Sequence, residues 1–154
     1  MGSPRLKMDD VPRYEALVNA IKRAYEDVDK ARYRLRDLAL VVVLTYTGCR
    51  LGEALKLRVS DLDFKSKVVR IKQEKKRGEF TRLVPVPSKL FWEIMRRYVK
   101  RLAFRDTSLF GISERQARNI VYKFTKRYLR RKIRPPLYVI ATRPSYSGRL
   151  EILR

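Results

Sequence analysis

The chain has 154 residues, 45% of them apolar, which is enough for one globular domain with its own hydrophobic core. Its 38 Lys and Arg against 16 Asp and Glu give a formal charge of +22, which predicts a polyanionic partner such as nucleic acid. One cysteine and no histidine exclude a disulfide framework and any zinc site built from Cys and His.

Residues 1–11 are interpreted as an N-terminal extension whose Met-Gly-Ser start resembles a cloning remnant. They contain no apolar signal segment, and the longest apolar run, LALVVVLTY, has about half the length of a membrane-spanning helix. We therefore expect a cytoplasmic, nucleoid-associated protein with no membrane partner.

Apolar residues three or four apart predict an amphipathic helix over 12–30 and a more buried helix over 32–46. The predicted core residues are Leu17, Ile21, Ala24 and Val28 in the first helix and Leu35, Leu38, Val42 and Tyr46 in the second. Propensity alone would also allow a strand at VVVLTY. Gly48 is expected to end the second helix, and LGEALKL to open a short one.

The pattern then changes to alternation in KVVRIKQ (67–73) and again in FTRLVPVP (80–87). This predicts a β-hairpin with Gly78 in its turn. Two further helices are expected over 89–104 and 114–130. Their predicted core residues are Phe91, Ile94, Met95, Tyr98 and Leu102, then Ala117, Ile120, Val121, Phe124 and Tyr128.

Capping residues support both helices, with Ser88 as the N-cap of the first and Ser113 with Gln116 as a capping box for the second. The predicted fold is α+β and mainly α: a helical core with one antiparallel β-hairpin or small sheet. After Pro135-Pro136 the chain has no helical period, so 12–134 is interpreted as the domain and 135–154 as an atypical tail.

The segment TYTGCRLGEALKLRVSDLDF resembles the first catalytic box of the tyrosine recombinase (phage integrase) family. That box has a buried helix, then T-G-x-R-x-x-E-x-x-x-L, then x-D-[IL]-[DN]. The matching residues are Thr47, Gly48, Arg50, Glu53, Leu57, Asp61, Leu62 and Asp63. The hairpin with its R-x-V-P ending, the Leu109-Phe110 pair and the last two helices follow in the family order. The resemblance covers 12–134 and implies the recombinase catalytic-domain fold.

The resemblance implies that Arg50 clamps the scissile phosphate, a role that suits a planar, always charged guanidinium. Its position at a helix start would also bring the phosphate near backbone amides. Glu53, one turn later, would hold the guanidinium by an ion pair. The family's general acid is a hairpin lysine: alignment on Gly78 selects Lys76, whereas alignment from Val69-Arg70 falls nearer to Lys75.

Double-stranded DNA is the partner that the resemblance implies, with no metal, nucleotide or other cofactor. Residues 96–134 hold 14 Lys and Arg against two acidic residues, which favours contact with the DNA backbone. The predicted DNA contacts are Thr47, Lys72, Arg77, Arg82, Arg115, Arg118, Lys123 and Arg127. The alternative is a solvated, charge-rich thermophilic surface, which the two Gln and two Asn would also fit.

The family pattern fails after 134, because the chain has no H-x-x-R box and no histidine at all. Tyr138 and Tyr146 lie beyond that point without the family context, and Tyr146 is retained as a weak candidate nucleophile. Back-translation of PLYVIAT in a shifted frame permits Thr-Leu-Arg-His-Ser-His. Residues 137–154 are therefore interpreted as an out-of-frame tail that follows a slip near Pro135-Pro136.

The chain is thus expected to be a truncated catalytic domain of a mobile-element recombinase, which binds DNA but is inactive alone. Possible partners include a second copy or protomers of an intact recombinase. One alternative is a non-catalytic regulator or decoy of an intact recombinase. Another is a small basic RNA-binding protein, which would leave the T-G-x-R box unexplained.

Overall fold

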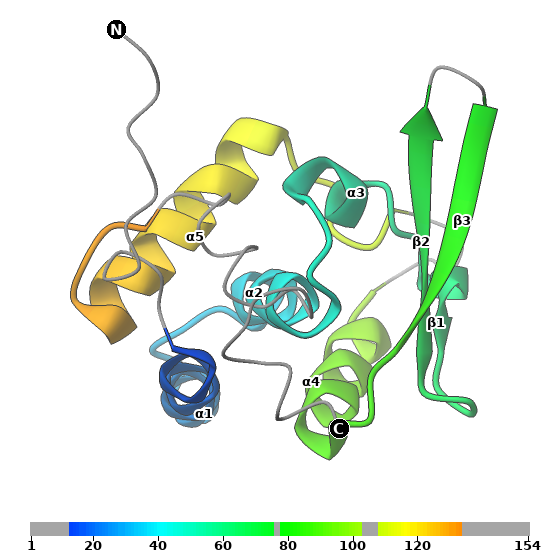
Figure 1. Ribbon diagram of the computed structural model, residues 1–154. Coiled ribbons are helices and arrows are strands. Elements are labelled where there is room, and N and C mark those ends of the chain that lie inside the picture. Colours follow the sequence, from blue (N-terminus) through cyan, green and yellow to red (C-terminus); the bar gives the residue numbers. More distant parts are fainter. Residues whose placement is uncertain (1–12, 76–77, 103–107, 134–154) are drawn as a thin grey trace, which may run out of the picture.

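The computed structural model describes residues 13–75, 78–102 and 108–133, which form a mainly helical fold with one small sheet (Figure 1). This confirms the predicted fold class. The elements are α1 (Tyr14–Asp29), α2 (Leu35–Thr47), α3 (Leu51–Leu55), the 3-10 helix η2 (Val59–Asp61), β1 (Leu62–Asp63), β2 (Val68–Lys75), β3 (Gly78–Pro85), α4 (Lys89–Lys100) and α5 (Glu114–Leu129).

Helix α2 lies at the centre of the fold, with α1, α4 and α5 around it (Figure 1). Every residue from Leu38 to Leu44 is fully buried. A helix that is apolar on all sides needs such an environment, and this explains why VVVLTY forms a helix although its β-branched residues would suit a strand. The predicted core is confirmed, except that Val28, Tyr46 and Leu102 are only partly buried.

The sheet has three antiparallel strands in the order β1-β2-β3. The predicted hairpin is confirmed, with Ile71 opposite Arg82. Gly78 is the first residue of β3, opposite Lys75, and not a turn residue as predicted. Strand β1 was not predicted, because a two-residue strand is too short to show alternation. Val69 and Ile71 are fully buried, so the sheet presents this face to the helices.

The predicted caps are confirmed. The Ser88 hydroxyl accepts a hydrogen bond from the Phe91 N–H at 3.2 Å. Ser113 and Gln116 form a reciprocal capping box, with bonds of 3.1 Å from Gln116 N–H to Ser113 Oγ and 2.9 Å from Ser113 N–H to Gln116 Oε1. Helix α4 ends at Lys100, earlier than the expected residue 104.

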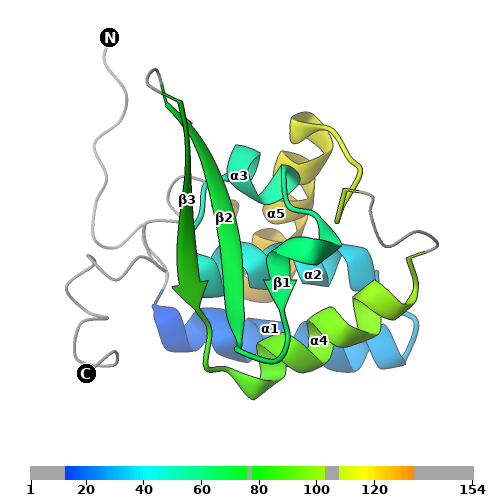
Figure 2. The same ribbon diagram turned by 90° about the vertical axis from the view of Figure 1, so that its right-hand side faces the viewer.

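The segment before α5 is joined to the segment after α3. Leu109 N–H donates to the Leu57 carbonyl at 2.8 Å, and Ser108 forms a β-bridge with Arg58. As a result, α3, the turn end of the hairpin and the N-terminal end of α5 lie toward the same end of the molecule (Figures 1 and 2). No helix within the described ranges is long and apolar enough to cross a bilayer.

Candidate functional site

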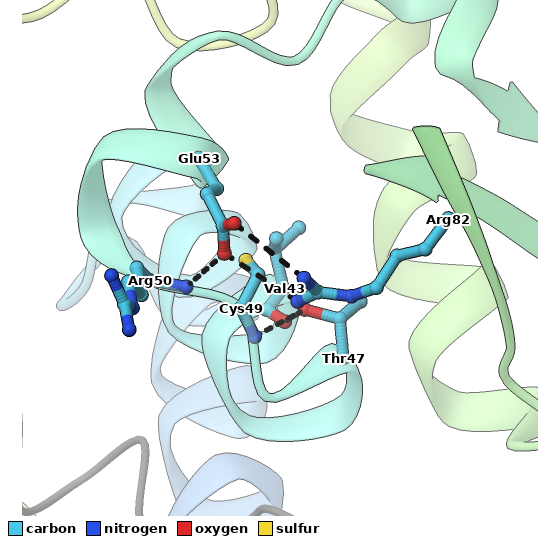
Figure 3. A network of polar contacts seen from close by, with 6 residues as sticks. All are labelled: Val43, Thr47, Cys49, Arg50, Glu53 and Arg82. Carbon is cyan, nitrogen blue, oxygen red and sulfur yellow. Dashed lines mark hydrogen bonds and ion pairs between the residues drawn. The ribbon is translucent and has the colours of Figure 1, made fainter. Parts of the chain in front are cut away.

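The turn between α2 and α3 is fixed by the backbone and by one side chain. Gly48 ends α2 in the left-handed region at φ 69°, and its N–H donates to the Leu44 carbonyl at 3.1 Å. A residue with a Cβ would be strained at this φ. The Thr47 hydroxyl donates to the Val43 carbonyl at 2.6 Å and accepts from the Cys49 N–H at 3.2 Å (Figure 3). Thr47 is buried, so its role in the structure is to hold this turn.

Arg50 is held at the backbone and exposed at the side chain. Its N–H donates to the Glu53 carboxylate at 2.8 Å, and its carbonyl accepts from the Ala54 N–H at 3.0 Å. An arginine side chain has no acceptor, so this is only the Glu53 half of a capping box. The guanidinium points away from Glu53 (Figure 3) and makes no hydrogen bond or ion pair with any residue of the described ranges.

The predicted ion pair between Glu53 and the Arg50 guanidinium is therefore wrong. Glu53 instead pairs with Arg82 of β3, whose two terminal nitrogens lie 3.4 and 3.5 Å from the carboxylate oxygens. The physical reason is competition: the Arg50 N–H and the Arg82 guanidinium already occupy the Glu53 carboxylate. The same bond means that the Arg50 N–H is not available to a phosphate.

Electrostatics at this site favour a charged Glu53 and a neutral Cys49. Burial alone would raise the pKa of the Glu53 carboxyl, but hydrogen bonds from the Arg50 N–H and Gln73 and the charge of Arg82 lower it below its ordinary value of 4.5. Burial raises the pKa of the Cys49 thiol to about 12, so this thiol is not a nucleophile at neutral pH.

Replacing Glu53 by Gln should lower the free energy of unfolding by about 1 kcal/mol at neutral pH, because the ion pair with Arg82 is lost. The folded-state pKa lies below 4.5, so this contribution is present above pH 4.5 and disappears as the pH falls through the lower folded value. Urea denaturation across this pH range measures the difference between the two proteins. Glu26→Gln, at an exposed position of α1, is the control; a Glu53 effect that did not shrink in acid would contradict the assignment.

The other predicted DNA contacts have different surroundings. Lys72 lies 4.0 Å from the buried carboxylate of Asp61, and Arg118 pairs with Glu114 at 3.5 Å. Arg115 and Lys123 are exposed on α5. All three α5 residues lie on the helix whose N-terminal end is next to α3.

Arg127 has a structural role. Its guanidinium donates to the Arg32 carbonyl at 2.9 Å and to the Asp27 carboxylate at 3.2 Å, and it lies 5.6 Å from the centre of the Tyr33 ring. Tyr128 reinforces this junction, because its hydroxyl donates to Asp27 at 2.6 Å. Arg127 thus joins α5 to α1 and the loop after it, and its predicted DNA contact stays a prediction.

Four predicted residues cannot be placed as side chains. Lys76, Arg77 and Tyr146 lie outside the described residues. Lys75 ends β2 opposite Gly78, at the turn end of the hairpin, but its side chain is not described. Within the described ranges, no group of three or more Cys, Asp or Glu residues is arranged to bind a metal ion.

Two residues help to hold the site together, but these roles were not predicted from the sequence. Gln73 hydrogen-bonds to Glu53 from β2, and Asp61 accepts a hydrogen bond from the Arg58 N–H at 2.9 Å while 3% exposed. Asp61 is part of the x-D-[IL]-[DN] motif, so the motif itself indicated that this residue has a role. Gln73 gave a weaker signal: it lies two residues after buried Ile71 and therefore on the same face of the strand.

The chain is similar to recombinases and integrases in both sequence and fold. The model of the phage integrase family matches residues 13–137. Tyrosine recombinase XerC of Thermodesulfovibrio yellowstonii is 31% identical over an alignment that covers 59% of this chain and 34% of that protein.

Solved structures share the fold. The XerA recombinase superposes with a TM-score of 0.64 at 18% identity, covering 92% of this chain and 50% of that one. The integrase of mycobacterium phage Brujita gives a TM-score of 0.64 at 12% identity, covering 92% and 44%. The Tn1549 transposon integrase, solved in complex with transposon right end DNA, gives a TM-score of 0.52 at 14% identity, covering 92% and 52%.

This chain therefore spans about a third of the curated relative and about half of these solved proteins. The family model, in contrast, covers most of this chain, from the start of α1 to beyond α5. The match includes the α2–α3 turn, the sheet and both C-terminal helices of the described structure. The chain belongs to the phage integrase family of tyrosine recombinases.

Proposed function

We propose that this chain is the DNA-binding part of a tyrosine recombinase catalytic domain that does not cleave DNA on its own. Arg50 binds a backbone phosphate of double-stranded DNA. A hairpin lysine, Lys76 or else Lys75, corresponds to the family's general acid, which protonates the leaving oxygen in an intact recombinase. The domain extends over 12–134, and residues 135–154 are an out-of-frame tail.

The observation that carries this proposal is the contrast between Arg50 and the paired arginines of the same fold. Arg82, Arg97 and Arg118 each form an ion pair with a carboxylate, at 3.4, 2.9 and 3.5 Å. The Arg50 guanidinium makes no such contact in the described ranges, although its backbone is held by Glu53. A cation on a fixed backbone that projects into solvent is well suited to bind an anion.

Phosphate chemistry agrees with this choice of residue. A guanidinium can donate two parallel hydrogen bonds to the non-bridging oxygens of one phosphate. In strand transfer the charge on these oxygens grows in the transition state, so the same contact would stabilise the transition state more than the substrate. Glu53 would contribute indirectly, by holding the Arg50 backbone and the Arg82 side chain.

The basic residues of α5, the helix that packs against α3, support duplex DNA as the partner. Arg115 and Lys123 are exposed there, and Arg118 is also exposed although it pairs with Glu114. Contacts of this type provide affinity that is independent of sequence and falls steeply with salt. The Tn1549 integrase, which shares the fold, was solved in complex with DNA.

The pure chain should bind duplex DNA but neither relax supercoiled plasmid nor form an SDS-resistant adduct with it. Cleavage in this family needs a nucleophilic tyrosine acting with the remaining catalytic residues as a unit, and single losses from such units are severe. Gel electrophoresis with and without SDS measures both activities. An adduct that disappears in Tyr146→Phe would overturn the proposal and identify Tyr146 as the nucleophile.

The absence of histidine from the sequence also favours a second candidate, a non-catalytic regulator or decoy of an intact recombinase. DNA footprinting distinguishes the two hypotheses. A regulator should protect one defined DNA site, whereas an incomplete catalytic domain should protect DNA diffusely. Tighter binding to RNA than to duplex DNA would favour an RNA-binding protein over both.

The tail has its own test. The nucleotide sequence from codon 130 onward should contain a second frame that continues as Leu-Arg-His and later encodes a helix with a tyrosine. Restoring that frame should then restore cleavage. If no such frame exists, the tail is native and the regulator becomes the better reading.

A further inference from the structure

A second basic surface lies at the end of the molecule opposite α3 and the hairpin turn. It is formed by α4 and the turn that joins β1 to β2, residues 64–67, which lie together at this end in both views (Figures 1 and 2). Its cations, called the α4 patch below, are Lys65, Lys67, Lys89, Arg96 and Lys100. All are exposed except Lys67, which is partly buried.

Two aromatic rings join the turn and the helix into one surface. The Phe64 ring lies 5.1 Å from the Trp92 ring, centre to centre, in an edge-on arrangement. The Lys67 amine lies 5.4 Å from the centre of the Trp92 ring, and the Arg96 guanidinium lies 5.7 Å from that of Phe64. Contacts of this kind restrict a cation without neutralising its charge.

The α4 patch carries uncompensated positive charge. None of its five cations forms an ion pair with a carboxylate among the described residues. On the neighbouring side of the fold, in contrast, Arg97 pairs with Asp29 at 2.9 Å. Two carboxylates are close to the patch in sequence: Glu93 is exposed on α4, and Asp63 accepts hydrogen bonds from the backbone of Lys65 and Ser66.

Lys67 occupies a conformation that glycine would adopt at lower energy. Its φ is +60°, in the left-handed region, and its carbonyl accepts from the Val86 N–H at 2.9 Å. A lysine therefore adds backbone strain at this position, where glycine would add none. Its amine lies over Trp92, within the patch.

We propose that the α4 patch binds the phosphate backbone of a second DNA duplex, so that one chain can bridge two duplexes. Arg50 lies at the opposite end, at the start of α3, so a duplex bound there would leave the patch accessible. The proposal goes beyond the proposed function, since it adds a second DNA surface that does not involve Arg50.

A duplex fits this surface better than a short acidic peptide does. Lys89 and Lys100 are separated by about 16 Å along α4, and Arg96 lies between them. A phosphate backbone presents negative charge continuously over such a length. The residues are cations, which suit contact with the phosphate backbone and provide no base readout.

The test uses one duplex immobilised on beads and a second, fluorescent duplex in solution, with the full chain added between them. The wild-type chain should retain the fluorescent duplex on the beads. Arg96→Gln/Lys100→Gln should lower this retention about tenfold. The slope of log binding against log salt concentration should become less steep by about two. Binding of a single duplex to limiting protein should remain, because the Arg50 site is intact.

Three further variants separate charge at this site from folding and from total charge. Lys67→Gly removes a patch cation where glycine suits the backbone, so bridging should fall while the denaturation midpoint stays equal or rises. Glu93→Gln should strengthen bridging. Lys126→Gln/Lys132→Gln removes the same charge from the last turn of α5 and the segment after it, and should leave bridging unchanged.

Wild-type-like bridging by the patch variants, or no bridging by the wild type, would overturn the proposal. If the patch variants lose binding to phosphatidylserine vesicles or to polyglutamate but still bridge DNA, the occupant of the patch is a membrane surface or an acidic peptide and not DNA. Arg50→Ala separates the two proposals. If Arg50→Ala leaves the affinity for a single duplex unchanged, the proposed function fails. The proposal for the α4 patch then depends on whether the patch variants lose bridging.

Discussion

Arg50→Ala should weaken binding to duplex DNA about tenfold at moderate salt, which corresponds to about 1.4 kcal/mol. A hydrogen bond to a charged group contributes about 1.5–3 kcal/mol when well formed, and exposure to water reduces this. The plot of log affinity against log salt should become less steep by about one. Fluorescence anisotropy of a labelled duplex over a salt series measures both quantities.

The side chain makes no hydrogen bond or ion pair with the described residues, so Arg50→Ala should change the free energy of unfolding by less than about 0.5 kcal/mol. Arg50→Lys should recover only part of the affinity, because an ammonium keeps the charge but loses the planar pair of donors. Arg36→Ala is the matched control, since Arg36 already pairs with Asp37 at 3.4 Å. Equal affinities for the Arg36 and Arg50 variants would show that Arg50 binds no phosphate.

Local signals predicted the helices and the position of Arg50 well. Ser88, Ser113 with Gln116, and Gly48 act on their own neighbours in sequence, so their capping roles follow from residue type and spacing. The T-G-x-R motif likewise predicted the position of Arg50 between α2 and α3, because both helices are adjacent to the motif in the sequence.

Partnerships across the fold could not be predicted in the same way. Glu53 meets Arg82, 29 residues later, because the register of β3 against β2 brings that side chain over α3. Arg127 meets Asp27 across 100 residues because α1 and α5 pack together. Both arginines looked like DNA contacts in the sequence, since charge reveals no partner until the packing is known.

The Glu53 network suggests how the two parts of the proposed site are coordinated. Gln73 and Arg82 come from the two strands of the hairpin, and both bind the carboxylate that also holds the Arg50 N–H. The hairpin that carries Lys75 and Lys76 is thereby tied to the turn that carries Arg50. This connection lies on the buried side of the sheet, where the Glu53 side chain is 12% exposed and the Arg82 side chain is 37% exposed.

Trp92→Ala should destabilise the fold by about 3–5 kcal/mol, the largest effect that we expect from one substitution. Trp92 is 2% exposed and contacts the Phe64 and Phe91 rings at 5.1 and 4.8 Å. Its indole N–H donates to the Val86 carbonyl at 2.6 Å, so truncation leaves both a cavity and an unsatisfied buried acceptor. Trp92 is the only tryptophan of the chain, so denaturation must be followed by circular dichroism.

Trp92→Phe separates the two causes, because a phenyl ring fills much of the space but cannot donate to Val86. Its expected loss is about 1–2 kcal/mol, close to the cost of one unsatisfied acceptor. Trp92 joins α4 to Phe64 in the turn between β1 and β2 and to Val86 just after β3, so Trp92→Ala should also loosen the hairpin relative to Arg50 and weaken duplex binding. A stable Trp92→Ala variant with unchanged DNA affinity would mean that the sheet is positioned by α3 and η2 instead, without help from α4.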